Sequence, residues 1–425
     1  MIGIRRSLSY PLAVVGLVLC FGAAWYSARA GVARLLSETA TGLSFTEYEA
    51  MATPLAESAV RLSPSDPESH YARAVAFAQA GDASAAVAEL ERVAELRPRY
   101  YQTWLKLGRA RERAGDAEGA LAAYRESVRL APFYAEPRWQ LGNALLRGGR
   151  LDEAFAELRR AAASRPQLLA YTVELAWRAY GGDARAVTQA VAPQTDAARV
   201  SLARFFARHG RAEEALALWR DARRAVGDKE HNAGDGERRA LVADLIAAGK
   251  YKEAYSVWAG DEKGAGSGGV GSVDGASLAD GGFESKAGGD EQGFGWRFAP
   301  KQAGVAVSLD QSSPHGGARS LLLKFDGAPD INARFASQLV PTESGARYRL
   351  TFAARAEDLV SGAPPVVSVL DAAGERALAQ SAPLARDTNG WREYELDFTA
   401  TDDAVLVVIR RAGCDAASCP VFGRA

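Results

Sequence analysis

Residues 101–134 read YQTWLKLGRARERAGDAEGALAAYRESVRLAPFY, and this stretch decides the fold of the central part of the chain. Two small residues, Gly108 and Ala120, stand where two short helices would cross, and Tyr124 fills the space between them. Gly115 ends the first helix, because glycine adopts the left-handed cap conformation without strain. A proline ends the second helix, because it lacks a backbone donor and clashes with the preceding turn. The stretch therefore predicts two antiparallel helices.

The same pattern occurs three times over residues 67–168, which gives 34 residues to each copy. Its small, aromatic and proline positions resemble the tetratricopeptide repeat, W-x2-L-G … A-x3-F … P. A single helix pair cannot bury its apolar face, so such repeats stack into a superhelix with a concave groove. The resemblance implies a solenoid fold and a protein partner bound in the groove.

In tetratricopeptide proteins the first helix of each pair lines most of the groove. The resemblance therefore gives these candidate protein-binding residues: Tyr71, Gln79, Arg109, Arg113, Trp139, Asn143 and Arg147. The arginines with Asn143 resemble a clamp for an acidic or C-terminal carboxylate group, since a guanidinium binds a carboxylate through two parallel hydrogen bonds. The alternative is a solvated face in an arginine-rich protein.

The N-terminal segment, residues 1–30, predicts a signal anchor. Residues 7–28 carry no charge and are long enough to cross a hydrocarbon core of about 30 Å. Arg5 and Arg6 precede them and favour a cytoplasmic N-terminus. We expect a single-pass protein of a bacterial-type inner membrane, with the bulk of the chain on the periplasmic side. The alternative is a secreted protein cleaved after Ala30, where Ala-Arg-Ala resembles a signal-peptidase site.

Outside the three firm repeats the helical pattern is weaker. Residues 31–66 are expected to form a degenerate helical cap, and residues 169–259 to form degenerate tetratricopeptide-like repeats. Residues 260–279 are rich in glycine and serine, a composition typical of a flexible linker. They contain a G-x-G-x-x-G motif, but no strand precedes it and no helix follows it, as dinucleotide binding requires.

From residue 280 to residue 425 the apolar period changes from that of a helix to that of a strand. Strand-like runs separated by glycine, proline and aspartate turns cover residues 305–309, 320–325, 348–352, 366–370, 394–398 and 404–409. Short strands at this spacing predict an all-β sandwich. The predicted fold class is therefore multidomain α + β, with a transmembrane helix, an all-α solenoid and a C-terminal all-β domain.

The C-terminal motifs resemble those of carbohydrate-binding modules of the family 4 and 9 type, which are β-jelly rolls. In order they are Asp280-Gly-Gly-Phe-Glu284, Gly295-Trp296, His315-Gly-Gly-Ala-Arg-Ser320 and Gly390-Trp391. The resemblance implies glycan binding, with Trp296 as a stacking platform. The candidate carbohydrate-binding residues are Trp296, Asn332, Arg334, Gln338 and Arg355. The alternative is that Trp296 is a core residue and the sandwich makes only protein contacts.

In that family a last strand begins at the position at which this sequence has residues 422–425. The resemblance therefore predicts a sandwich that is one strand short and has an exposed sheet edge. A truncated reading frame is one explanation. Completion of the sheet by another chain or by the linker that precedes the domain is the other.

The sequence predicts no catalytic or metal site. Cys414 and Cys419 are expected to form a disulfide in an oxidising compartment, and no further Cys or His stands near them as a metal ligand. The motifs H-E-x-x-H, G-x-S-x-G and G-x-x-x-x-G-K-[ST] do not occur. A net charge of -1 gives no basic field for nucleic acid. We therefore expect no enzyme activity, no cofactor and no nucleic-acid partner.

These expectations combine into one functional hypothesis. The chain is predicted to be a membrane-anchored extracytoplasmic scaffold in envelope or exopolysaccharide assembly. Its repeats would bind a protein partner and its jelly roll would bind polysaccharide. The alternatives are a pure protein–protein adaptor whose sandwich binds no sugar, and an envelope glycan-processing enzyme.

Overall fold

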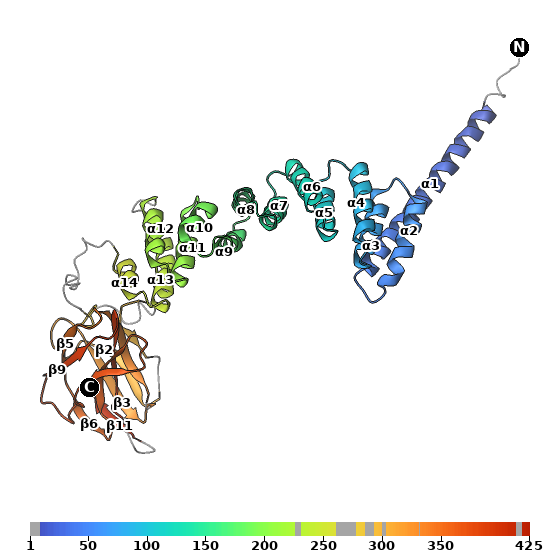
Figure 1. Cartoon of the computed structure of the whole chain (residues 1–425). Helices are drawn as coiled ribbons and strands as arrows, with labels where there is room; N and C mark the ends of the chain where they lie inside the picture. The colour runs from blue at the N-terminus through green and yellow to red at the C-terminus, as the bar shows by residue number, and fades with distance from the viewer. Residues whose placement is uncertain are drawn as a thin grey trace, which may run out of the picture. The chain divides into compact units, whose positions relative to one another are not determined.

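The computed structural model describes residues 9–225, 231–260, 278–284, 293–299, 303–330, 332–413 and 419–425. The chain divides into two compact units, Met1–Ala192 and Pro193–Ala425. The first unit contains helices, and the second contains four further helices and an all-β domain (Figure 1).

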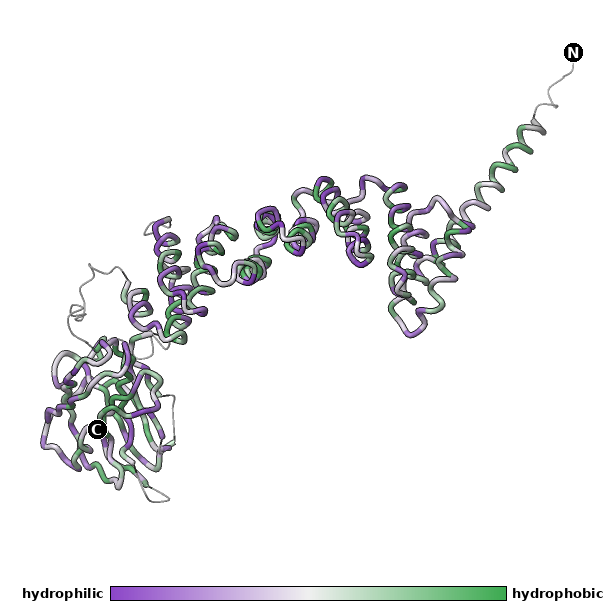
Figure 2. The backbone as a smooth tube through the Cα atoms, in the orientation of Figure 1, coloured by the Kyte–Doolittle hydropathy of each residue, from purple (hydrophilic) through white to green (hydrophobic). Residues whose placement is uncertain are grey.

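The first helix of the chain, α1 (Ser9–Leu43), is apolar and exposed over its N-terminal part (Figure 2). The stretch Leu12–Leu43 is long and apolar enough to cross a membrane, although an N-terminal signal sequence has the same properties. The C-terminal part of α1 instead packs against the following helices, so that Ala33 and Ala40 are fully buried. One continuous helix therefore contains both the predicted membrane segment and the beginning of the predicted cap.

The remaining helices of the first unit form antiparallel pairs. After a 3-10 turn (Glu49–Met51) they are α2 (Ala52–Leu62), α3 (Pro67–Gln79), α4 (Ala83–Leu96), α5 (Tyr101–Arg113), α6 (Ala117–Leu130), α7 (Ala135–Arg147), α8 (Leu151–Ser164), α9 (Leu168–Ala179) and α10 (Ala184–Val191). Aspartate caps begin several of them: the Asp82 and Asp116 side chains each accept a hydrogen bond from a first-turn backbone N–H.

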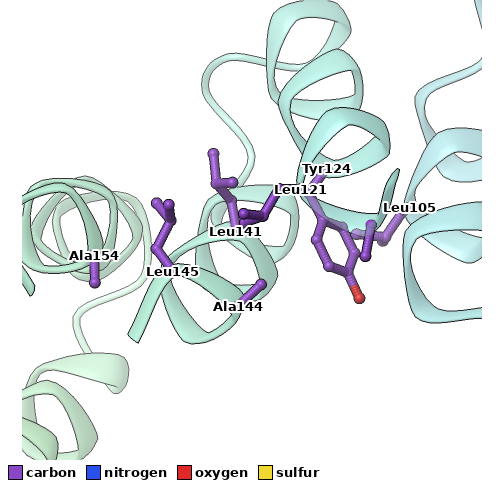
Figure 3. Close-up of a cluster of buried hydrophobic side chains, with 8 residues drawn as sticks. Leu105, Leu121, Tyr124, Leu141, Ala144, Leu145 and Ala154 are labelled. Carbon is purple, nitrogen blue, oxygen red and sulfur yellow. The ribbon is translucent and has the colours of Figure 1, made fainter. Parts of the chain in front are cut away.

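The close helix crossings that the sequence predicts are present. A Cβ added to Gly108 would lie 2.5 Å from the Tyr124 ring, and one added to Gly142 would lie 2.7 Å from Leu158 Cγ. The buried cluster around Tyr124 draws its side chains from α5 to α8, across two successive copies (Figure 3). Each copy thus buries its apolar face against the next.

The second unit begins with four helices, α11 (Asp196–Arg208), α12 (Ala212–Ala225), α13 (His231–Ala247) and α14 (Tyr251–Ala259). Leu202, Phe206, Leu241 and Leu245 are fully buried among them. The all-β domain follows. Its strands are β1 (Arg297–Phe298), β2 (Val305–Asp310), β3 (Ser320–Gly327), β4 (Arg334–Pro341), β5 (Arg347–Ala354), β6 (Glu357–Ser361), β7 (Pro365–Asp371), β8 (Ala377–Gln380), β9 (Arg392–Thr399), β10 (Ala404–Arg411) and β11 (Val421–Arg424).

Every pairing described in the β domain is antiparallel, and the strands form three sheets. Their orders are β1-β4-β10-β7-β8, β2-β3-β11-β6 and β5-β9. The five-stranded sheet shares one apolar cluster with the four-stranded sheet, through Phe335 and Phe325. It shares another with the β5–β9 ribbon, through Val405 and Leu396. The domain is therefore a two-layer sandwich whose second layer is divided into a sheet and a ribbon.

Residues 421–424, where the resemblance predicts the beginning of a last strand, form β11 between β3 and β6. The pairing of β11 with β6 shifts register between Phe422 and Arg424. Gly423 lies at this irregularity with φ +104°, a conformation that only glycine adopts without strain.

Candidate binding surfaces

The predicted groove residues lie on the first helices of three successive pairs, and their charges are partly satisfied within the chain. Arg109 of α5 forms an ion pair with Glu136 of α7, and the two side chains are 41% and 40% exposed. Glu136 also accepts a hydrogen bond from Gln140 Nε2 at 3.4 Å. A ligand carboxylate would therefore compete with Glu136 for Arg109.

Arg147 of α7 is held in the same way by Glu112 of α5. The other oxygen of Glu112 accepts a hydrogen bond from the buried Tyr124 hydroxyl at 3.0 Å. Burial raises the pKa of the Tyr124 hydroxyl above its ordinary value, and the neighbouring Glu112 carboxylate raises it further. Tyr124 thus stays a neutral donor that helps to fix Glu112 opposite Arg147.

Arg113 differs from these two arginines. It is exposed at the end of α5, and within the described ranges no ion pair is recorded for it. The predicted clamp therefore contains one guanidinium available for an incoming carboxylate and two that already have partners.

The uncharged groove residues are placed as follows. Tyr71 lies under Lys106, whose Nζ is 3.6 Å from the ring centroid. Asn143 Nδ2 donates to Trp139 O at 2.8 Å, so the amide is turned toward its own helix. The Trp139 ring meets the exposed Tyr171 ring edge to face, with centroids 6.4 Å apart. Gln79 is exposed at the end of α3.

An exposed aromatic row at the starts of α5 and α7 was not part of the sequence prediction. Phe133 is 85% exposed, and Tyr100 and Tyr134 are also exposed. The rings of Tyr101 and Tyr134 lie 5.2 Å apart. The signal was present in the sequence, because Tyr100 and Tyr134 occupy the same position in two successive copies.

In the β domain a cavity of about 410 Å³ lies between β3 and β5. Its floor is aliphatic and comes from the five-stranded sheet, through Val367, Val407 and Ile409. Two tryptophans, Trp296 and Trp391, also line it. A largely apolar cavity with a few aromatic and polar groups is the usual form of a ligand site.

The structure separates the predicted carbohydrate-binding residues. Trp296 and Arg355 both line the cavity, whereas Asn332 and Arg334 line a different surface depression. Arg334 Nη2 donates to Gly374 O at 2.5 Å. Arg355 forms an ion pair with Glu357.

Trp296 is half-buried rather than freely exposed. Its ring packs on Phe283 with centroids 4.8 Å apart, and its Nε1 donates to Asp280 O at 3.1 Å. The Nε1 edge of the Trp296 ring is therefore held by the segment before β1, while the residue also lines the cavity. Trp391, which lies edge to face with His315 at 5.3 Å, is the second aromatic residue there.

Gln338 does not contribute to an accessible site, because its side chain is fully buried. Its Nε2 donates to Ala279 O at 2.7 Å and to Phe294 O at 3.0 Å. The amide therefore fastens the segments before β1 onto β4. Strand alternation predicts which face Gln338 occupies, but those distant segments cover that face.

The cysteine prediction stays untested, because Cys414 lies outside the described residues. Within the part of the chain that the structure describes, no group of three or more His, Cys, Asp or Glu side chains is arranged to hold a metal ion.

Comparison with known proteins bears on the helical region. A tetratricopeptide repeat family model matches residues 52–101 and 105–168. A search of curated proteins with this sequence finds no match.

Several solved structures are similar to the chain. MamA from Desulfovibrio magneticus RS-1 is 21% identical, with a TM-score of 0.34, over 39% of this chain and 92% of MamA. YrrB, a tetratricopeptide protein with an unusual peptide-binding site, is 16% identical, with a TM-score of 0.31, over 45% of this chain and 89% of YrrB. The pilF protein of Pseudomonas aeruginosa is 16% identical, with a TM-score of 0.35, over 49% of this chain and 99% of pilF. By its family match and its stacked helix pairs, the chain carries tetratricopeptide repeats at residues 52–101 and 105–168.

Proposed function

We propose that the chain is a scaffold whose repeats bind the acidic or C-terminal end of a partner protein along the first-helix face of α3, α5 and α7. The observation that carries this proposal is the exposed Arg113, which follows Arg109 by one turn on α5. An exposed guanidinium can bind a carboxylate through two parallel hydrogen bonds. Arg109 and Arg147 would join it when their glutamate partners move aside.

The charge-reversing substitution Arg113→Glu is expected to weaken binding of a peptide with a free C-terminal carboxylate by about tenfold or more. The reason is that an attractive charge becomes a repulsive one while the helix fold is retained. The measurement is calorimetric titration of the full chain with peptides selected from a carboxylate-terminated library.

Two variants sharpen this test. Glu136→Gln releases Arg109 from its ion pair and should strengthen binding severalfold. Arg125→Glu reverses an exposed charge on the second helix of the same pair and should leave binding unchanged. Equal affinity of the Arg113 variant and the parent would show that the ligand binds elsewhere.

We further propose that α1 is retained as a membrane anchor, which places the bulk of the chain outside the cytoplasm. Support comes from Arg29, within the alternative cleavage motif, whose Nε donates to Leu62 O of α2 at 2.6 Å. Cleavage after Ala30 would remove this contact. Mass spectrometry of the membrane-extracted protein should find an N-terminus that precedes α1, and a chain beginning at Gly31 would exclude the anchor.

Polysaccharide binding by the β domain, within envelope or exopolysaccharide assembly, is a second candidate function. It is favoured by the two tryptophans of the cavity, Trp296 and Trp391, since aromatic faces stack on sugar rings. A glycan array probed with the full chain should then give signals that fall about tenfold with Trp391→Ala. Trp139→Ala, which removes a tryptophan from α7 instead, serves as the control. Absence of binding to every glycan by the folded chain would remove this candidate.

A further inference from the structure

The aromatic row at the starts of α5 and α7 is a surface of neighbouring rings. Tyr101 contacts the rings of both Tyr100 and Tyr134, with centroids 6.3 and 5.2 Å apart. The Tyr100 and Tyr134 rings therefore lie no further apart than the sum of these two distances. Both are exposed, and they occupy the same position in successive copies. The row thus presents one exposed tyrosine per repeat.

The row adjoins the predicted groove at α3. A cavity of about 140 Å³ is lined by Tyr100 together with Tyr71, which is one of the groove residues. The charged residues of its lining are Glu68, Arg97 and Lys106. Glu68 forms an ion pair with Arg97, whereas Lys106 lies over the Tyr71 ring and has no carboxylate partner among the described residues. One positive charge therefore remains uncompensated beside the row.

Arg99, immediately before Tyr100, adds a second such cation. It is exposed, and within the described ranges no ion pair is recorded for it. The hydroxyls of Tyr100 and Tyr134 likewise have no recorded hydrogen-bond partner in the part of the chain that the structure describes. The surface therefore combines aromatic rings, free hydroxyl donors and positive charge.

A polyproline II helix matches this combination. It has three residues per turn, rises by about 9 Å per turn, and leaves its backbone carbonyls without internal hydrogen bonds. One turn therefore fits within the separation of the Tyr100 and Tyr134 rings, and the free carbonyls can accept hydrogen bonds from the two hydroxyls. Proline-rich segments bind aromatic-lined grooves at low entropic cost, because their conformation is formed before binding.

We propose that the aromatic row binds a proline-rich segment of a partner polypeptide that also carries acidic side chains. Prolines three positions apart would pack against Tyr100 and Tyr134. Acidic side chains of the segment would face Lys106 and Arg99. The segment would cross from α5 to α7 instead of following either helix.

Other ligands fit the row less well. An added β-strand requires an unpaired strand edge, whereas these rings stand on helices. A bound helix would leave the tyrosine hydroxyls without acceptors, since its own carbonyls are paired internally. A glycan stacks on an open aromatic face, but neighbouring rings of the row are tilted by 48° and 36° and form no flat platform.

The inference goes beyond carboxylate binding at Arg113. The helix rises by about 18 Å between Tyr101 and Arg113. Exposed charges separated by more than about 8 Å are largely screened at physiological ionic strength. Binding at the aromatic row is therefore separable from binding at Arg113, and either can fail without the other.

The test uses the full chain in detergent and a fluorescently labelled peptide of three Pro-Pro-Glu copies with an amidated C-terminus. We expect saturable binding by fluorescence polarisation, which Arg113→Glu should change by less than about twofold. A peptide of three Ala-Ala-Glu copies has the same charge but is not preformed, so it should bind about tenfold more weakly. Slower backbone hydrogen exchange at residues 100–103 and 134–137 should locate the proline peptide.

The substitution Tyr134→Ala provides the decisive variant. The side chain is 59% exposed and makes no cap hydrogen bond, so the fold should be retained. Peptide affinity should fall by about tenfold or more, whereas Tyr134→Phe, which loses only the hydroxyl, should weaken it about threefold. Tyr48→Ala removes a 56% exposed tyrosine outside the row and should bind like the parent.

Three results would overturn the proposal. They are undiminished binding by a folded Tyr134→Ala variant, equal binding of the alanine and proline peptides, and failure of the proline peptide to bind. If the proline peptide fails while glycan-array signals of the chain fall with Tyr134→Ala, the row binds sugar instead.

Discussion

Replacing Tyr124 with alanine is expected to lower the free energy of unfolding of the repeats by about 3–5 kcal/mol. The ring is fully buried, and it fills the space that Gly108 leaves open at the crossing of α5 and α6. It also contributes to the cluster that joins two successive copies (Figure 3). In a solenoid each copy is stabilised by its neighbours, so the loss should spread from this pair to α7 and α8. Urea unfolding followed by circular dichroism measures this loss in the free energy of unfolding.

Tyr124→Phe separates the packing of the ring from its hydrogen bond. This variant retains the buried ring and loses only the bond from the hydroxyl to Glu112, so it should cost about 1 kcal/mol. If the two variants were equally unstable, the hydroxyl network and not the ring would hold the crossing together.

The repeats were predictable from sequence because the contacts that define them are local. Gly108 and Tyr124 stand within one copy, and the same spacing recurs with Gly142 and Leu158 in the next. The N-terminal region shows what a sequence pattern leaves open. Its predicted membrane segment and the beginning of its predicted cap lie in one helix, α1, since no proline ends the helix between them.

The candidate site was harder to predict because its partners come from other copies or other strands. Arg109 was assigned to the groove, but its ion pair is with Glu136, 27 residues away, and that of Arg147 is with Glu112, 35 residues away. Residue spacing within one helix contains no information about either pairing. The burial of Gln338 was hard to predict for the same reason, since the two carbonyls that accept its hydrogen bonds lie 59 and 44 residues from it.

The cavity between β3 and β5 could not be derived from strand patterns alone. Alternation predicts which residues of β3 and β5 are apolar, and both strands were predicted. Which strand edges remain unpaired depends on the order of strands in each sheet, and this order is set by non-local pairing.

The second large effect is expected for Gly423→Ala in β11, which should lower the stability of the β domain by about 2–5 kcal/mol. A Cβ at this position would lie 2.3 Å from Asp358 O and 2.8 Å from Leu359 N. Both atoms belong to the backbone of β6, so they can yield only if β6 and β11 separate. Thermal unfolding measures the loss, and hydrogen exchange at β6 should accelerate with it.

Gly390→Ala is the matched control, because it tests backbone strain without the collision. Gly390 has φ +112°, close to the +104° of Gly423, but no heavy atom lies within 4 Å of its added Cβ. Strain alone should cost this variant about 1–2 kcal/mol. The difference between the two substitutions then measures how firmly β6 is held against β11. If Gly423→Ala were no more harmful than Gly390→Ala, β6 would be free to move away.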